Sequence, residues 1–403
     1  MESQKTITDE VKIDDVLDRG TIVQILPTKN EFREKLLSGE KLRFYWGFDA
    51  TGPNLHLSHA KNFILMEKFR KLGHEVIVLF GDFTARIGDP SGEDSARKQL
   101  SREEVLENVK RWKEVVKPLM DFQDNVNPPK IMYNHDWLSK LTFEDVINLA
   151  SNFTVQQMLE RDMFENRLKE KKPIYLHEFL YPLMQGYDSV AMEVDVEMCG
   201  TDQIFNALAG RTLLKKLKNK EKFVVAATLM ANPKTGDLMS KTKGTGVFFN
   251  VSADDLYGQI MAQPDEMIEV LFINVTPLSL DEIKSIIGAN NPKEAKMRLA
   301  EEITKIFHGE KLAAEAVDNF MNTFSKGGVP DDLPEVSVAQ GTKLIEMLLV
   351  EKIVISKSEF RRLVSEGAVT NMDSDKKVED PDALAESGVY KVGKRRFIKI
   401  KVI

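Results

Sequence analysis

The chain has 403 residues, more than one ordinary domain holds, so two or three domains are expected. Hydrophobic residues make up 42% and charged residues 30%, as in soluble globular proteins, and no apolar run reaches the roughly 18 residues of a membrane span. The polar, acidic N-terminus does not resemble a signal or transit peptide, and the single cysteine excludes an internal disulfide. The net charge of −7 argues against a nucleic-acid coat over the whole chain. We therefore expect a cytoplasmic protein with no membrane contact.

Residues 1–40 have an amphipathic pattern that predicts helices. An apolar run at 42–48 then predicts a buried strand, and the turn-rich segment 49–54 follows it. Apolar residues at helical spacing end before Gly73, and 75–80 predicts a second buried strand. Strand, turn, helix and strand form one βαβ unit. Its ligand site is expected at the carboxyl ends of the strands, over the helix N-terminus.

Two histidines, His56 and His59, stand at the start of the predicted helix and share one helical face because they are three residues apart. A helix N-terminus already favours an anion, and two imidazoles add hydrogen-bond donors for phosphate oxygens. Two other interpretations remain open: half of a metal site, for which no third ligand lies nearby, and a pair of incidental surface histidines. The position over the strand ends favours phosphate binding.

The string GFDATGPNLHLSH, followed by GDFTARIGDPSG, resembles the signature of class I aminoacyl-tRNA synthetases, and of the tyrosyl-tRNA synthetases in particular. The resemblance implies an α/β fold: a Rossmann-type parallel-sheet catalytic domain, a small helical domain and a C-terminal α+β S4-like RNA-binding domain. It implies that His56 and His59 act in catalysis and bind ATP. It also implies that Gly47, Asp49 and Thr51 lie on the ATP side of the site.

Further helices are predicted at 101–120 and 142–167, with a short strand at 130–133 between them. The second helical region carries an apolar stripe that indicates a core or a subunit interface: Met158, Leu159, Met163 and Phe164. Because the resembled family is dimeric, we expect a homodimer with its interface at about 142–187.

Three polar residues, Tyr181, Gln185 and Asp188, stand four and three residues apart, so one face of an otherwise apolar helix presents all of them. They must be hydrogen-bonded, either within an internal polar cluster or to a ligand. The resemblance favours a ligand, because the matching Tyr and Gln of the family meet the ammonium group of tyrosine. The matching Asp meets its phenol hydroxyl.

The resemblance brings residues from other stretches to the same pocket. Tyr45 is expected to share the phenol hydroxyl with Asp188, and Asp89 in GDPSG is expected to face the ammonium group. In CGTDQ, Asp202 is expected to bind the ribose of ATP, and Gln203 to lie close to the amino-acid carboxylate. Apart from the resemblance, Asp89 could be a turn residue and Asp202 a helix cap.

The Gly-, Lys- and Thr-rich stretch 232–245 predicts a mobile loop. Within it, LMSKTKG resembles the Lys-Met-Ser-Lys-Ser loop of the family, which implies that Lys241 binds ATP and acts in catalysis. Leu238 stands where the family has its first lysine, and Thr242 where it has its last serine. One missing cation costs about 10²–10³ in rate if the group acts only in the transition state.

Residues 1–249 are expected to form the catalytic domain and 250–324 a helical domain that contacts the anticodon. The Gly-, Pro- and Asp-rich stretch 325–341 is predicted to be a linker. Residues 342–403 resemble an S4 domain and carry 13 Lys and Arg against 10 Asp and Glu, a net of +3 that leaves −10 on the rest. The residues expected to contact RNA are Lys357, Arg361, Arg362, Lys394, Arg395 and Arg396. For KRRFIKIK, an equal alternative is a solvent-exposed edge strand whose basic side chains prevent pairing with another chain.

We therefore expect a ligase that activates L-tyrosine with ATP, which brings Mg²⁺, and transfers the tyrosyl group to the 3′ end of tRNA(Tyr). No protein-bound metal or prosthetic group is expected. One alternative is a tryptophan–tRNA ligase, against which Tyr45 and Asp188 argue. The other is an inactive paralogue that only binds RNA, an interpretation motivated by Leu238 and by Ser58, which replaces a glycine of the family signature.

Overall fold

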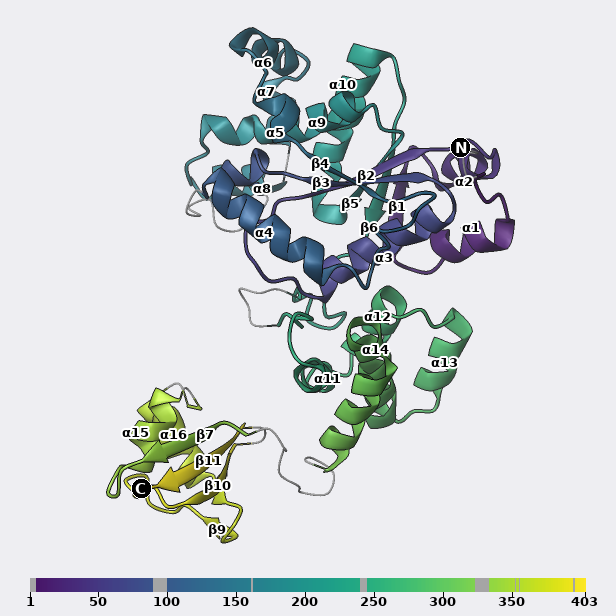
Figure 1. Cartoon of the computed structure of the whole chain (residues 1–403). Coiled ribbons are helices and arrows are strands. Elements are labelled where there is room, and N and C mark those ends of the chain that lie inside the picture. The colour runs from purple at the N-terminus through teal and green to yellow at the C-terminus, as the bar shows by residue number, and fades with distance from the viewer. Residues whose placement is uncertain are drawn as a thin grey trace. The chain divides into compact units, whose positions relative to one another are not determined.

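The computed structural model describes residues 5–89, 100–160, 162–239, 245–322, 333–351, 353–354, 356–393 and 396–403. The chain forms two compact units, residues 1–313 and 314–403, and each has its own sheet (Figure 1). Within the described ranges, none of the helices is both long and apolar enough to cross a membrane.

The first unit is organised around a six-stranded sheet in the order β1-β6-β5-β2-β3-β4. Neighbouring strands are parallel, except that β1 runs antiparallel to β6. The chain builds outward from β2 to β4 and returns beside β2 with β5, so the strand order reverses there. This confirms the expected parallel α/β sheet, and ligands bind at such a reversal. The strands are β1 (Ile22–Leu26), β2 (Arg43–Phe48), β3 (Glu75–Phe80), β4 (Lys130–Tyr133), β5 (Val196–Gly200) and β6 (Phe223–Ala227).

Helices cover both faces of this sheet. α3 (Leu57–Lys71) and α4 (Arg102–Val115) lie on one face, and α9 (Tyr181–Met192) and α10 (Ile204–Lys218) lie on the other (Figure 1). Because both faces are covered, β3 (EVIVLF) is an almost continuous buried apolar run rather than an alternating one. Between β4 and α9 the chain forms α5 (His135–Leu138), α6 (Phe143–Ala150), α7 (Val155–Leu159) and α8 (Asp162–Lys169).

The expectation of helices throughout residues 1–40 is wrong in the middle of that range. α1 (Glu10–Leu17) and α2 (Lys29–Leu37) are helices, but β1 lies between them as an edge strand of the sheet. Its sequence, IVQIL, is short and β-branched, and it stands between Gly20 and Pro27. An edge strand with mixed burial has no clear two-residue alternation, so the surrounding helical pattern obscured it.

The remainder of the first unit is helical, as expected from residue 250 onward. The helices are α11 (Ala253–Met261), α12 (Met267–Val275), α13 (Leu280–Gly288) and α14 (Pro292–Phe320), whose last residues belong to the second unit. Ser252 and Ser279 cap α11 and α13, each accepting a hydrogen bond from a backbone N–H three residues later. α14 is interrupted at Gly309, where φ is 81°.

The second unit has a five-stranded sheet in the order β7-β11-β10-β8-β9. Its own core is formed by buried residues such as Leu348, Phe360, Val392 and Ile398. The expected pair of short helices followed by a strand is confirmed. The elements are β7 (Glu335–Val338), α15 (Leu344–Val350), α16 (Lys357–Ser365), β8 (Val369–Asn371), β9 (Lys376–Lys377), β10 (Gly388–Val392) and β11 (Arg396–Val402).

Strand β7 lies inside the range 325–341 that was predicted to be a linker. It pairs in parallel with β11, and Glu335 forms ion pairs with Lys399 and Lys401. The C-terminal end of the expected linker is therefore corrected, and the second sheet begins at Glu335. The isolated four-residue sequence EVSV gave no signal of this pairing, because its partner strand lies some 60 residues further along the chain.

Candidate active site

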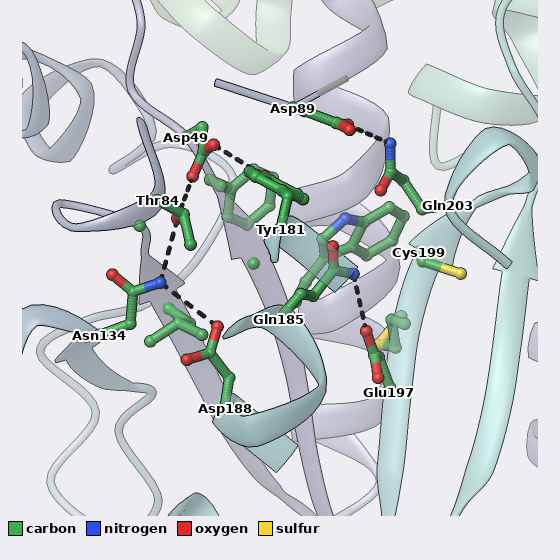
Figure 2. Close-up of a pocket in the computed structure, with 16 residues that line it drawn as sticks. Asp49, Thr84, Asp89, Asn134, Tyr181, Gln185, Asp188, Glu197, Cys199 and Gln203 are labelled. Carbon is green, nitrogen blue, oxygen red and sulfur yellow. Dashed lines mark hydrogen bonds between the residues drawn. The ribbon is translucent and has the colours of Figure 1, made fainter. Parts of the chain in front are cut away.

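A pocket with about 670 Å³ of empty volume opens at the carboxyl end of the sheet, where the strand order reverses. Figure 2 shows the residues that line it. β2 contributes Trp46, Gly47 and Phe48, and β5 contributes Glu197, Met198 and Cys199.

Most of the residues predicted to bind the amino acid are brought together here. α9 supplies three of them from one face, as the spacing predicted, and two more come from the segments after β3 and β5. They are Tyr181, Gln185, Asp188, Asp89 and Gln203. Two of the residues predicted on the ATP side, Gly47 and Asp49, also line the pocket.

Asp188 is buried at one end of the pocket, with 3% of its surface exposed. Trp137 Nε1 donates a hydrogen bond to its Oδ1 at 2.7 Å. Asn134 Nδ2 donates to Oδ2 at 3.3 Å (Figure 2). Burial raises the pKa of the Asp188 carboxyl well above its usual range, although these two donors oppose the shift. The carboxyl is thus held in one orientation with lone pairs left for a ligand.

Asp49 follows β2 and accepts two hydrogen bonds. The Tyr181 hydroxyl donates to Oδ2 at 2.8 Å, and the Thr84 hydroxyl donates to Oδ1 at 2.7 Å. Burial raises the pKa of the Asp49 carboxyl to about 7. This arrangement needs a glycine at position 81, because a Cβ there would lie 2.0 Å from Asp49 Oδ1 and 2.2 Å from the Thr84 hydroxyl.

A chain of side-chain amides connects α9 to Asp89. Asn206 Nδ2 donates to Gln185 Oε1 at 3.0 Å and to Gln203 Oε1 at 2.8 Å. Gln203 Nε2 in turn donates to Asp89 Oδ2 at 2.6 Å, and Gln185 Nε2 donates to Glu197 Oε1 at 3.0 Å (Figure 2). These contacts fix which end of each amide is the acceptor.

His56 and His59 lie at the N-terminus of α3, with ring centroids 4.1 Å apart, and neither is among the residues that line the pocket. The backbone N–H of His56 donates to His59 Nδ1 at 3.3 Å, so the proton of His59 is on Nε2. Burial lowers the pKa of His56 to about 4 and that of His59 to about 3. Both imidazoles are therefore neutral hydrogen-bond donors near pH 7.

Three other predicted residues lie outside the pocket lining. Tyr45 is 1% exposed and lies outside the pocket lining, with its hydroxyl 3.1 Å from the Ser189 hydroxyl. Thr51 and Asp202 are exposed and also absent from the lining. Lys241 lies outside the described residues.

Of the residues expected to contact RNA, Lys357, Arg361 and Arg362 lie exposed on α16. Arg396 is tied internally, donating to the Ile353 carbonyl at 2.5 Å and to Glu359 Oε1 at 2.9 Å. Lys394 and Arg395 lie outside the described residues.

Several pocket residues were not anticipated from the sequence. Thr84 and Asn134 follow β3 and β4, so the rule that ligands meet the carboxyl ends of parallel strands could have pointed to them. Glu197 is a charged residue inside the apolar strand VEMCG, which signals a buried partner. That partner is Lys222, which lies directly before β6.

Residues 37–325 match the model of the protein family described as tRNA synthetases class I (W and Y). The chain belongs to this family. Its curated relatives include the tyrosine–tRNA ligases of Desulfotalea psychrophila and Thermotoga maritima. The first is 39% identical, over 96% of this chain and 97% of the relative. The second is also 39% identical, over 98% of both chains. The chain is thus a class I synthetase of the tyrosine–tRNA ligase type.

Solved structures of the same fold include C-terminally truncated mitochondrial tyrosyl-tRNA synthetases. That of Aspergillus nidulans matches with a TM-score of 0.65 and 21% identity, over 78% of this chain and 94% of that one. That of Coccidioides posadasii matches with a TM-score of 0.62 and 22% identity, over 76% of this chain and 91% of that one. This chain therefore has the same fold as the two mitochondrial enzymes.

Proposed function

We propose that the pocket binds L-tyrosine, that the chain joins it to ATP as tyrosyl-adenylate, and that it then transfers the tyrosyl group to tRNA(Tyr). The observation that carries this proposal is Asp188, a buried carboxyl held by Trp137 and Asn134 at one end of the pocket. A buried acceptor in that position suits a phenol hydroxyl and leaves an unpaired group when the ligand lacks one.

The other end of the pocket suits the ammonium group. Asp49, Asp89 and the Tyr181 hydroxyl present oxygen atoms there, and the described lining holds no Lys, Arg or His to oppose a cation. Gln185 Oε1, turned away from Glu197, adds a neutral acceptor. The amino acid would be aligned by its two polar ends, which leaves its carboxylate as the reacting group.

Activation joins the tyrosine carboxylate to the α-phosphorus of ATP. One carboxylate oxygen attacks, the bond to the bridging oxygen breaks, and pyrophosphate leaves with that electron pair. No side chain forms a covalent bond, so catalysis rests on positioning and on charge stabilisation. His56 and His59, as neutral donors at the N-terminus of α3, would hold phosphate oxygens, with Lys241 and the Mg²⁺ carried by ATP.

The tRNA is the second substrate. We propose that residues 250–324 contact its anticodon region, and that the second unit holds RNA through exposed basic side chains of α16, including Lys357 and Arg361. We further propose a cytoplasmic homodimer. Six large apolar side chains between positions 143 and 176 are more than half exposed, which suits a protein interface: Phe143, Ile147, Val155, Leu168, Tyr175 and Leu176.

Exchange of pyrophosphate into ATP tests the proposal directly. Tyrosine should support exchange, while tryptophan and phenylalanine at the same concentration should not. Exchange with tryptophan alone would instead assign the tryptophan branch of the family. Folded protein that exchanges with none of the three amino acids would leave only an RNA-binding role.

The same assay tests the altered loop. Leu238, with 42% of its surface exposed, occupies the place of a family lysine. If that cation acts in the transition state, Leu238→Lys should raise the exchange rate, by up to about 10²-fold. An unchanged rate would mean that other cations already stabilise the phosphates.

A further inference from the structure

A buried ion pair lies beside the amino-acid pocket. Glu197 and Lys222 have side chains that are 1% and 0% exposed, and Lys222 Nζ donates to Glu197 Oε2. Lys222 Nζ also donates to the Ser189 hydroxyl at 2.8 Å. None of the predicted roles involves this pair, although Glu197 lines the pocket itself.

A buried carboxylate without a partner is costly, so Glu197 needs the positive charge of Lys222 beside it. The described lining contains four carboxyl groups, those of Asp49, Asp89, Asp188 and Glu197, and no basic residue. A bound amino acid brings a single cation. If Glu197 lacked Lys222, its negative charge would attract that cation and compete with Asp49 and Asp89 for it.

Glu197 also controls an amide that faces the ligand. As a carboxylate it only accepts hydrogen bonds, so it selects the Nε2 end of Gln185, at 3.0 Å. The Oε1 end of Gln185 is then directed to Asn206, on the side of Gln203. A neutral group at position 197 could either donate or accept, and would let this amide turn over.

The third member, Ser189, connects the pair to Tyr45. The Ser189 hydroxyl accepts from Lys222 and donates to Glu197 Oε2 at 3.2 Å. Its proton is thus already used, so the Tyr45 hydroxyl, 3.1 Å away, is the donor in their hydrogen bond. The pair therefore sets the direction of a hydroxyl as well as that of an amide.

The ion pair has room because the residue packed against it is a glycine. Gly210 on α10 approaches the three groups so closely that a Cβ there would lie 2.6 Å from Lys222 Nζ and 2.8 Å from the Ser189 hydroxyl. The same Cβ would be 3.2 Å from Glu197 Oε2. The junction of α9, α10, β5 and β6 is thus closed over the ion pair by backbone rather than by a side chain.

We propose that Lys222, through Glu197 and Ser189, is a positioning residue of the amino-acid pocket. The positive charge of Lys222 compensates the negative charge of Glu197, so that Glu197 does not compete for the ammonium group. Glu197 then acts only as the hydrogen-bond acceptor that orients the Gln185 amide toward the ammonium group. This inference rests on the proposed function, in that tyrosine is taken as the ligand, and it assigns the ion pair to the ammonium end of the pocket.

Calorimetric titration of the full-length protein with tyrosine, without ATP, tests the proposal. The comparison ligand is 3-(4-hydroxyphenyl)propionate, which lacks the ammonium group. Lys222→Met should weaken tyrosine binding about tenfold, and leave the affinity for the comparison ligand within about twofold. Lys220→Met is the matched control, because that partly exposed lysine two residues earlier pairs with Asp195, which does not line the pocket.

The double variant Lys222→Met/Glu197→Gln separates positioning from folding. It has no unpaired buried charge, so its denaturation midpoint should return toward that of the wild type. Its tyrosine affinity should stay reduced by about three- to tenfold, because the Gln185 amide can now turn. Wild-type affinity in the double variant, or an equal loss for both ligands, would overturn the proposal. Tyrosine binding without pyrophosphate exchange in the wild type would count against the proposed function alone.

Discussion

At the scale of single residues, the carboxyl groups of the pocket differ in the partners that hold them. Asp188 is held by two nitrogen donors, Asp49 by two hydroxyl donors, and Glu197 by Lys222. Each carboxyl has its own partners, so each can take a separate task. The predictions at this scale concern Asp188 and Asp49.

Replacing Asp188 by alanine removes the acceptor proposed for the phenol hydroxyl. We expect the preference for tyrosine over phenylalanine, measured as the ratio of kcat/KM in pyrophosphate exchange, to fall by about tenfold, the effect of one lost hydrogen bond. Asp136→Ala is the control, because Asp136 is exposed on α5 beside Trp137. An unchanged ratio in Asp188→Ala would remove Asp188 from the recognition of the hydroxyl.

The pH dependence should follow Asp49 rather than the histidines. Its pKa is raised to about 7, so protonation below pH 7 removes a negative charge that favours the ammonium group, and kcat/KM for tyrosine should fall as pH falls through about 7. His56 and His59, with pKa values of about 4 and 3, stay neutral there. Asp49→Asn should have lower activity at pH 8 and a flatter profile. A break near pH 6.5 that persists in this variant would implicate a histidine.

The same shift has a consequence for stability. The folded protein holds a proton on Asp49 between pH values of about 4 and 7, whereas the unfolded chain, with a pKa of 3.8, has lost it. The folded state binds more protons in this window, so the contribution of this carboxyl to the free energy of unfolding decreases as pH rises from about 4 to about 7.

At the scale of secondary-structure elements, α9 and α10 pack closely against each other beside the pocket. Gly210 lies where any side chain would meet the Glu197–Lys222 pair, so Gly210→Ala should lower the free energy of unfolding by about 1–3 kcal/mol through overpacking. Gly258, in the middle of α11, has open space around it. Gly258→Ala should raise the free energy of unfolding by about 0.5–1 kcal/mol. Urea denaturation measures both, and equal effects would contradict the packing argument.

The elements differ in how well the sequence predicted them. β2, α3, β3 and α9 were expected near their observed positions, because buried runs and helical spacing are local signals. β1 and β7 were missed, because each is a short edge strand that is defined by a partner far along the chain. The pocket shows the same division. The spacing of Tyr181, Gln185 and Asp188 predicted one face, whereas Asn134 and Lys222 reach the site only through tertiary contacts.

At the scale of the whole molecule, the exposed apolar side chains of 143–176 bear on assembly. Phe143 and Leu176 are each 80% exposed, which is unusual for such large apolar residues. If they lie in a dimer interface, Phe143→Glu/Leu176→Glu should shift the sedimentation coefficient from dimer to monomer without loss of helix content. Val350→Glu is the control, because Val350 is 75% exposed in the second unit. A monomeric wild type would contradict the proposal.

The second unit has its own sheet and core, so we expect the first unit to fold without it. The cut belongs before β7, because a deletion starting at Thr342 would leave Glu335–Val338 without its partner strand. Deleting residues 333–403 should keep tyrosine-dependent pyrophosphate exchange within about twofold, while charging of tRNA(Tyr) falls about tenfold or more as phosphate contacts are lost. Equal losses in both reactions would mean that the second unit supports the fold rather than RNA binding.

Salt dependence distinguishes lost RNA contacts from a general loss of activity. Each phosphate contact adds to the slope of log affinity against log salt, so the truncated chain should show a smaller slope for tRNA binding than the full chain. Lys357→Glu/Arg361→Glu should reproduce part of this change in the intact chain, because both residues are exposed on α16. Arg396→Gln should act differently. Arg396 holds Glu359 and the Ile353 carbonyl, so its loss should lower the stability of the second unit more than the salt slope.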